Sequence, residues 1–457
     1  MLNVLRLSKL SELYARLRKS KPSLAAVSYL VVAFLEKGIG FFALWLLARL
    51  LSPKDVGIYS VVLSWRVLLS TILTLNVKAS VTVAFFELSE QEFRRFVSAI
   101  VALGWLSTCA FVAGWLFSGV DTSSFFGIEN VYLLLVLLWI LGAFPLEVSH
   151  MIWKAEYNYN RYTLSHLSFV VGQYLIGFGL LFAGREATEA PLIWLMLVGG
   201  TGFVLAMGLF TIVRLLQEGF WTIVHCKHWR YGVAVSLPLM AHLLAHAMLS
   251  RADQIMILNV HGEEAVGLYS VAYRFGELSM VFWAALNGVW SVWFKKQYDL
   301  ARFARIKRVV GLYVALFAAV VFLLIGVGWV GIRLLLPPVY SDTVALLPPI
   351  AMSGFFAVLY SFYVVVEYYE KHNAMIAAST VLAAVVNIAL NAIFLPGTGY
   401  GIAAWTTLAT YVLLFLFHAS YVELRLQKSV ANSFMLVSVG MVMVISAIAL
   451  SALLSHT

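Results

Sequence analysis

Apolar runs of about 20 or more residues recur along the whole chain, and this pattern limits the possible folds more than any other feature. A helix of about 20 apolar residues crosses the hydrocarbon core of a bilayer, whereas barrel strands are alternating segments of about 10 residues. No such alternation occurs, so the chain is predicted to be an all-α, polytopic membrane protein. About thirteen transmembrane helices are predicted, at residues 24–50, 56–85, 96–118, 131–152, 163–183, 191–215, 232–259, 265–294, 309–335, 344–369, 374–395, 401–422 and 431–454.

The composition agrees with this class, because 62% of the residues are hydrophobic and only 12% are charged, against about a quarter in soluble proteins. The net charge of +9 comes from basic residues spread over many loops, which indicates membrane topology and not a nucleic-acid partner. Cys109 lies in an apolar run and Cys226 in a basic loop, so neither is assigned to a disulfide, a metal site or a nucleophile. The first apolar run is too long for a cleaved signal peptide.

A short phrase occurs twice, 210 residues apart, each time between two apolar runs. The identical pairs are Val56 and Val266, Gly57 and Gly267, Tyr59 and Tyr269, Ser60 and Ser270, and Val61 and Val271. We interpret each copy as the hairpin between the first two spans of a repeat, with its glycine opening the second helix. Because each half has six spans, both copies enter the membrane in the same direction. This predicts parallel repeats about an axis along the membrane normal, with function between the two halves.

The repeats define five predicted regions. Residues 1–22 form a cytoplasmic amphipathic helix, in which leucines at helical spacing over 2–21 alternate with Lys and Arg, as is typical of an interfacial helix on an anionic leaflet. The other regions are an N-lobe at 23–216, a cytoplasmic linker at 217–231, a C-lobe at 232–424 and an additional C-terminal helix at 425–457. Basic residues gather in alternate loops, which predicts a cytoplasmic N-terminus in the inner (cytoplasmic) membrane.

Several charged residues lie far from the ends of their spans, where each costs about 2.5–3.5 kcal/mol unless it has a partner or a wet cavity. Cations outnumber acids among them, and an excess of buried positive charge favours an anionic ligand. The predicted substrate-binding residues are Lys37, Arg66, Arg251 and Arg274. The alternative is that they form ion pairs inside the bundle, such as Arg274 with Glu277 three residues later.

The chain has no Walker-type phosphate loop, so a transporter with this sequence would have to draw on an ion gradient or on consumption of the substrate outside. The predicted ion-coupling residues are Asp253, Glu36, Glu277, His242 and His246. Asp253 lies two residues from Arg251, and two interpretations stay open. Uptake of a proton or sodium ion by Asp253 would release Arg251, or the two residues stay together and only orient the span. His242 with His246, and Glu147 with His150, have spacings seen in metal sites, but too few further ligands accompany them, so no metal and no cofactor are expected.

Three phrases carry a resemblance to a known family: LLSPKDVGIYSVV, DQIMILNVHGEEAVGLYSVAYRF and NIALNAIFLPGTGYGIAAWTTLATYVLLF. In this order they resemble the polysaccharide-exporter branch of the multidrug/oligosaccharidyl-lipid/polysaccharide exporter superfamily, and the chain looks like a Wzx-type lipid-linked oligosaccharide flippase. The resemblance implies two six-helix lobes that rock about a central cationic cavity and move a polyprenyl-pyrophosphate-linked oligosaccharide to the outer leaflet. It also implies membrane lipids and glycan polymerase and export machinery as partners.

Two other functions are weighed against the flippase. A cation-coupled multidrug antiporter of the same fold would favour acids over bases inside the membrane, and the observed balance of charges disfavours it. A membrane glycan polymerase or ligase would be an enzyme and usually has a large outer loop, whereas the longest outer loop here, near residues 119–130, is short. The sequence therefore predicts a transporter and not an enzyme.

Overall fold

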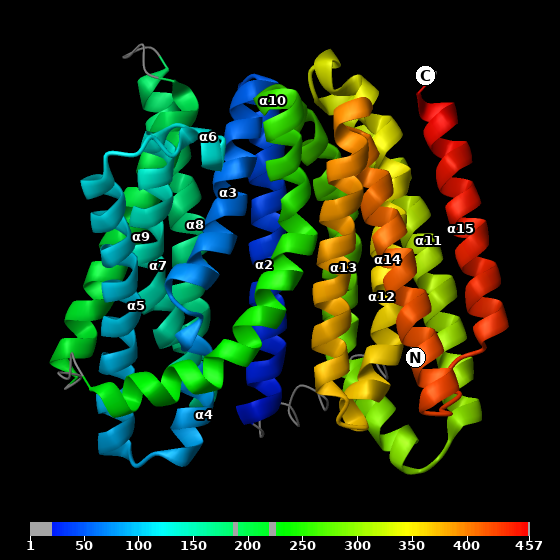
Figure 1. Ribbon diagram of the computed structural model, residues 1–457, viewed down its shortest axis with the longest axis horizontal. Coiled ribbons are helices and arrows are strands. Elements are labelled where there is room, and N and C mark those ends of the chain that lie inside the picture. The colour runs from blue at the N-terminus through cyan, green and yellow to red at the C-terminus, as the bar shows by residue number, and fades with distance from the viewer. Residues whose placement is uncertain (1–20, 186–190, 219–224, 456–457) are drawn as a thin grey trace, which may run out of the picture. The chain divides into compact units, whose positions relative to one another are not determined.

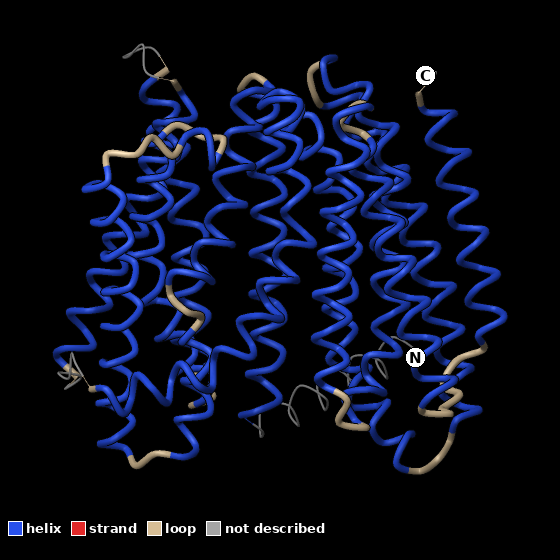
Figure 2. Tube along the Cα trace, in the orientation of Figure 1, coloured by secondary structure: helices blue, strands red, loops and turns tan. Residues whose placement is uncertain are grey.

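The computed structural model describes residues 21–185, 191–218 and 225–455, and in these ranges the chain is helical with short loops and no strand (Figures 1 and 2). The amphipathic helix predicted over residues 2–21 falls, apart from Lys21, outside the described residues. The α-helices are α2 (Lys21–Leu50), α3 (Pro53–Leu73), α4 (Ser80–Glu87), α5 (Glu90–Ser118), α6 (Ser123–Phe126), α7 (Asn130–Ala155), α8 (Tyr159–Gly184), α9 (Leu192–Gln217), α10 (Cys226–Asp299), α11 (Phe303–Leu335), α12 (Leu347–Tyr369), α13 (Asn373–Phe394), α14 (Ile402–Ser420) and α15 (Ser433–Leu454). Four short helical segments join them: η1 (Val77–Ala79), η2 (Pro338–Leu346), η3 (Leu395–Gly397) and η4 (Tyr421–Arg425).

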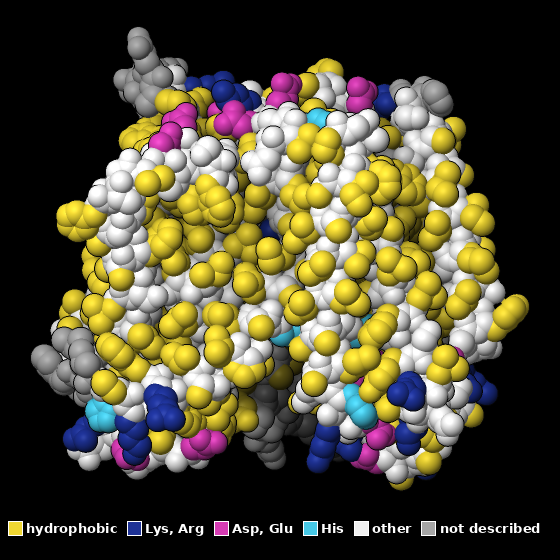
Figure 3. Space-filling view, viewed as in Figure 1, with side chains coloured by type: hydrophobic (Ala, Val, Ile, Leu, Met, Phe, Trp, Pro, Cys, Tyr) yellow, Lys and Arg dark blue, Asp and Glu magenta, His cyan; other side chains and the backbone are white. Residues whose placement is uncertain are grey.

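Twelve helical segments of the described residues are long and apolar enough to cross a membrane, so the predicted class of all-α polytopic membrane protein is confirmed. The difference from about thirteen lies in α10, a run of 74 residues that contains the predicted spans 232–259 and 265–294. Its two arms are separated at Gly262, whose φ of 82° is open to glycine but strained for other residues. Figure 3 shows apolar side chains along the middle of the helices and charged side chains near their ends.

The predicted span 56–85 is wrong as a single helix. α3 ends at Leu73, and Leu75 and Asn76 have positive φ values of 51° and 46° before η1 and α4 continue the chain. Asparagine tolerates the left-handed region better than most residues, and here it allows the break. At the break, Lys78 Nζ lies 2.6 Å from Glu147 Oε2 of α7, so the interruption places a basic side chain against a neighbouring helix.

The first copy of the repeated phrase begins α3, but the glycine does not open the helix as predicted. The helix begins at Pro53, where a missing N–H costs nothing, and the Ser52 hydroxyl accepts a bond from the Asp55 amide at 3.2 Å. Asp55 also places negative charge at the positive end of the helix dipole. Gly57 therefore lies about one turn inside α3, where its role is packing.

Both repeated glycines lie at a single helix crossing, between α3 and the second arm of α10. A Cβ added at Gly57 would overlap the carbonyl of Glu263, and a Cβ added at Gly267 would overlap the carbonyl of Pro53. The other repeated residues of both copies are buried. The phrase recurs because each copy supplies half of a close, nearly symmetric contact that only a residue without a side chain permits.

The chain forms two compact units. Unit 1 comprises Met1–Gly40, Leu69–Val120 and Leu134–Met240, and unit 2 comprises Phe41–Leu68, Asp121–Leu133 and Ala241–Thr457. In unit 1, Phe96 of α5 and Phe144 of α7 are among the residues of an apolar core that also includes α4. In unit 2, α12 is buried along nearly its whole length and packs against α11, α14 and α15. The lobe boundaries predicted from the repeats remain a prediction.

Candidate functional site

Two arginines of unit 2 share one glutamate. The Arg251 Nη2 atom lies 3.3 Å from Glu277 Oε1, and the Arg274 Nη1 atom lies 2.8 Å from Glu277 Oε2. The two arginines stand at nearly equal distances along the chain from Gly262, so the reversal at this glycine brings the arms of α10 together and makes the cluster. The structure therefore joins three of the predicted site residues, and it contains the Arg274–Glu277 ion pair that was given as the alternative to substrate binding.

Among the three side chains of this cluster, the cations outnumber the acids. Two guanidinium groups face one carboxylate, and their side chains are only 12% and 15% exposed. The Arg251 Nη1 atom is buried and has no hydrogen-bond partner in the described part of the chain. A buried donor without an acceptor costs about 1–3 kcal/mol, which an anionic ligand oxygen would recover.

Asp253 occupies a separate polar network of unit 2 and does not pair with Arg251. Its carboxylate accepts hydrogen bonds from the Tyr269 hydroxyl at 2.9 Å, the Asn391 side-chain amide at 2.7 Å and the Thr407 hydroxyl at 2.6 Å. Asp253 is 1% exposed. A carboxylate with several neutral donors can be held in the interior without a cation, so the predicted exchange between Arg251 and Asp253 has no counterpart in this conformation.

Arg66 of α3 is 6% exposed, in the same unit. The 210-residue shift places Ser64, not Arg66, opposite Arg274. The Ser64 hydroxyl donates to the Gln254 side-chain oxygen at 2.5 Å, so this position also contacts the first arm of α10. The equivalent position thus carries a hydroxyl bonded to the first arm of α10 in one copy and a cation paired with Glu277 in the other.

His242 and His246 do not join the Asp253 network. The Nδ1 atom of His242 is buried without a hydrogen-bond partner among the described residues, and His246 is exposed. Within the described ranges no group of three or more His, Cys, Asp and Glu side chains could hold a metal ion.

Unit 1 contains the remaining predicted residues and a histidine that sequence reasoning missed. Glu36 Oε2 lies 3.1 Å from His166 Nε2, whose Nδ1 lies 3.5 Å from Nδ1 of His150. Lys37, the next residue after Glu36, is exposed. The only sequence signal for His166 was its place in an apolar span, where a polar side chain needs a partner. Nothing in the spacing of 36, 150 and 166 indicates that the three residues meet.

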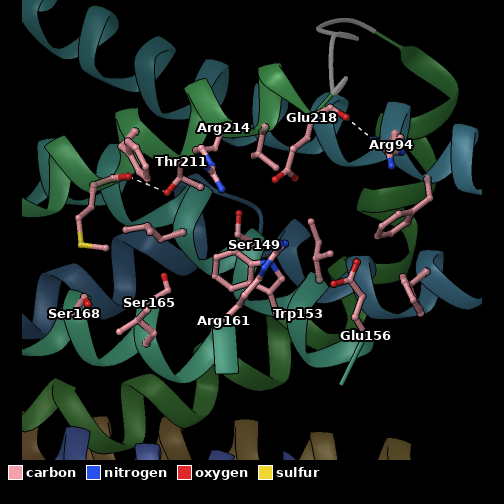
Figure 4. Close-up of a pocket in the computed structure, with 18 of the residues that line it drawn as sticks. Arg94, Ser149, Trp153, Glu156, Arg161, Ser165, Ser168, Thr211, Arg214 and Glu218 are labelled. Carbon is pink, nitrogen blue, oxygen red and sulfur yellow. Dashed lines mark hydrogen bonds between the residues drawn. The ribbon is translucent and has the colours of Figure 1, made fainter. Parts of the chain in front are cut away.

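A cavity of about 880 Å³ lies in unit 1 beside this group. Its walls come from α4, α5, α7, α8 and α9, and its polar lining includes Ser149, Ser165 and Thr211 (Figure 4). Arg161 and Arg214 extend into the part of the cavity next to Ser149 (Figure 4). The surrounding wall is mostly apolar, so the cavity combines an apolar body with charges from the loop ends of the helices.

Comparisons with known proteins decide the family. The family model described as "Polysaccharide biosynthesis protein" matches residues 25–294, more than half of the chain. The chain belongs to this family. The resemblance to the polysaccharide-exporter branch of the multidrug/oligosaccharidyl-lipid/polysaccharide exporter superfamily is thereby confirmed. No curated protein matches the chain significantly.

Solved structures share the fold. The lipid II flippase MurJ in an inward closed conformation is similar with a TM-score of 0.69 and 16% identity, over 93% of this chain and 97% of that chain. An outward-facing multidrug resistance MATE family transporter of the MOP superfamily is similar with a TM-score of 0.53 and 14% identity, over 89% and 97%. A MATE in complex with MaD3S has a TM-score of 0.52 and 12% identity, over 90% and 98%. The chain is a multi-pass membrane protein with a transporter fold.

Proposed function

We propose that the protein is a flippase that moves a polyprenyl-pyrophosphate-linked oligosaccharide across the cytoplasmic membrane. The family is described by polysaccharide biosynthesis, and the fold is that of transporters, one of them named for a lipid-linked substrate. The oligosaccharide is an O-antigen, capsule or exopolysaccharide repeat unit. In this proposal the N-terminus is cytoplasmic, and the lobes at 23–216 and 232–424 alternate between inward and outward access.

One observation carries the proposal: Arg251 and Arg274 share the single carboxylate of Glu277, and the Arg251 Nη1 atom is buried without a partner among the described residues. A pyrophosphate offers several anionic oxygens in the geometry that guanidinium groups bind with two parallel bonds. A cationic drug would instead meet a net positive cluster here, which disfavours the multidrug antiporter. Lys37 and Arg66 complete the proposed set of cations.

Binding of a short-chain polyprenyl pyrophosphate to the purified protein tests this site. Arg251→Ala and Arg274→Ala should each weaken binding by about tenfold to 150-fold, because each removes a charge-assisted contact of about 1.5–3 kcal/mol. Arg305→Ala is the matched control, since Arg305 is exposed at the beginning of α11. Unchanged affinity in both cluster variants would remove the pyrophosphate from this site.

Energy coupling is proposed to use a proton or sodium gradient, with Asp253, Glu36, Glu277, His242 and His246 as the candidate residues. Asp253→Asn tests the buried member of this set, because the amide keeps the shape but cannot take up a cation. Transport that no longer responds to collapse of the gradient supports coupling at Asp253. A normal gradient response with normal protein levels assigns Asp253 to holding α10, α13 and α14 together.

A further inference from the structure

Four side chains of unit 1 form a continuous hydrogen-bonded chain. It runs from Glu36 of α2 to His166 of α8 at 3.1 Å, then to His150 of α7 at 3.5 Å. The chain ends at the Ser165 hydroxyl, which lies 3.0 Å from His150 Nε2. Its members come from α2, α7 and α8, and α8 supplies both His166 and Ser165, so the hydrogen-bonded chain exists only in the folded unit.

The two ends of this hydrogen-bonded chain are less buried than its middle. Ser165 lines the cavity of unit 1, together with Ser149 and Ser168 (Figure 4). The Glu36 side chain is 45% exposed, whereas His166 is 14% and His150 only 5% exposed. The buried members therefore connect a cavity to a carboxylate within a membrane span, and water need not reach the histidines themselves.

One set of tautomers lets every link point in the same direction. If His150 carries its proton on Nδ1 and His166 on Nε2, the Ser165 hydroxyl donates to His150, His150 donates to His166, and His166 donates to Glu36. A proton that arrives at the Ser165 oxygen then displaces one proton along each link, and the last protonates the Glu36 carboxylate. The first state returns when the proton leaves Glu36 by the reverse transfers along the same links, so this exchange between Glu36 and the cavity needs no other reactant.

The surrounding charges limit the hydrogen-bonded chain to one mobile proton. Lys154 and Lys78 interact electrostatically with His150, and Lys37 and Lys154 with Glu36. Lys78 is paired with Glu147, and Lys154 lies 4.6 Å from the Tyr162 ring, which stacks on His166. Tyr29 packs edge-on against Tyr162. These cations disfavour a second positive charge on the histidine pair.

We propose that Glu36, His166, His150 and Ser165 are a proton relay that connects the unit 1 cavity with the middle of α2. This rests on the proposed function in one respect, since the relay supplies the coupling ion of the transport cycle. The topology prediction places the cavity at the cytoplasmic end, because its lining residues Arg94, Arg161 and Arg214 belong to the basic helix ends predicted to face the cytoplasm. The relay therefore joins Glu36 to the cytoplasm.

The cavity that Ser165 lines also contains a carboxyl group that can take up protons. Glu156 lines the same cavity just beyond the end of α7. Loss of hydrating water raises the pKa of Glu156, with Arg161 opposing the shift and Glu218 adding to it. A carboxyl whose pKa is raised toward neutrality exchanges protons more readily at physiological pH than an ordinary surface glutamate.

Proton uptake after a pH jump tests the relay without any substrate. The full chain is placed in lipid nanodiscs, and a soluble pH indicator follows the uptake in a stopped-flow instrument. Glu36→Gln should remove one proton-binding phase. Ser165→Ala should keep that phase but slow it at least about tenfold, because a positioned acid–base group usually contributes about 10²–10⁴-fold to proton transfer.

Ser168→Ala is the matched control. Ser168 lies on the same helix, lines the same cavity and forms none of the relay's hydrogen bonds, so proton uptake by this variant should equal that of the wild type. His166→Gln, which keeps a donor for Glu36 but cannot pass a proton on, should behave like Ser165→Ala. Equal uptake rates in Ser165→Ala, Ser168→Ala and wild type would overturn the relay.

A second measurement separates this inference from the proposed function. Proteoliposomes with an imposed pH gradient and a fluorescent polyprenyl-pyrophosphate-linked sugar report translocation. Loss of acceleration by the gradient in Ser165→Ala but not in Ser168→Ala supports relay and function together. If no variant and no wild type translocates the sugar, the proposed function fails, while the uptake experiment still decides the relay.

Discussion

The polar groups of the two units differ in how deeply their side chains are buried. In unit 2, Asp253 is sealed and satisfied by neutral donors from α10, α13 and α14. In unit 1, Glu36 keeps 45% of its side chain exposed and is joined through histidines to a cavity. A sealed network holds helices in place at little cost, whereas an accessible titratable network can exchange protons.

The difference shows how two halves with a common sequence phrase can carry different functional residues. The repeated phrase keeps a common helix crossing at Gly57 and Gly267, but the polar residues around the spans are not repeated. Unit 2 carries the excess positive charge of Arg251 and Arg274, and unit 1 carries the titratable chain of Glu36 and its histidines. In the two proposals, anion binding and proton exchange therefore lie in different units.

The largest expected effect is on stability. Asp253→Ala should lower the free energy of unfolding by about 3 kcal/mol or more, because it leaves the donors of Tyr269, Asn391 and Thr407 buried without an acceptor. Glu36→Ala should cost about 1 kcal/mol or less, since its carboxylate is partly exposed. Thermal unfolding of the purified variants in detergent measures both. Equal losses in the two variants would break the distinction between a sealed and an accessible network.

The repeated glycines should give a smaller loss. Gly57→Ala and Gly267→Ala each force a methyl group onto a backbone carbonyl, and such overpacking costs about 1–3 kcal/mol. Gly38→Ala is the control in unit 1, because nothing lies within 4 Å of the position its Cβ would take. It should be neutral or stabilising by up to about 1 kcal/mol. Melting temperatures that fall equally in all three would contradict the crossing as the reason for the repeat.

The smallest effects are dependences on pH with opposite signs in the two units. Desolvation raises the pKa of Glu156, so its negative charge destabilises the folded state at neutral pH. Glu156→Gln should be more stable than wild type at about pH 7, and the difference should vanish below the ordinary glutamate value of about 4.3.

Asp121 of unit 2 provides the opposite case. Bonds from the Ser123 amide and hydroxyl lower the pKa of Asp121, so its charge stabilises the folded state above the ordinary value of about 3.9. Asp121→Asn should be less stable than wild type at about pH 7, with the loss disappearing as wild type is acidified through its lowered pKa. Unfolding temperatures measured between about pH 3 and 8 compare each variant with wild type. A change in stability of the same sign in Glu156→Gln and Asp121→Asn at neutral pH would contradict the two pKa directions.

Much of the fold could be predicted from hydrophobic run length, since a bilayer demands helices of a fixed length. The break at Gly262 falls between the predicted spans 232–259 and 265–294. The break at Asn76 could not be located in this way, because an apolar average hides a single residue with positive φ. The pair of Arg274 and Glu277 followed from helical spacing. The pairing of Arg251 with Glu277 and the contact of His166 with Glu36 depend on tertiary packing, which spacing does not encode.

Translocation by the purified protein tests directly whether the protein is a flippase. Proteoliposomes contain a polyprenyl-pyrophosphate-linked sugar with a fluorescent label, and a membrane-impermeant quencher reports how fast the label reaches the outer leaflet. We expect exchange to be faster than in protein-free vesicles. The rate should fall at least about tenfold in the double variant Arg251→Ala and Arg274→Ala. The rate in Arg305→Ala should be unchanged. Exchange no faster than in protein-free vesicles, or full activity in the double variant, would contradict the account.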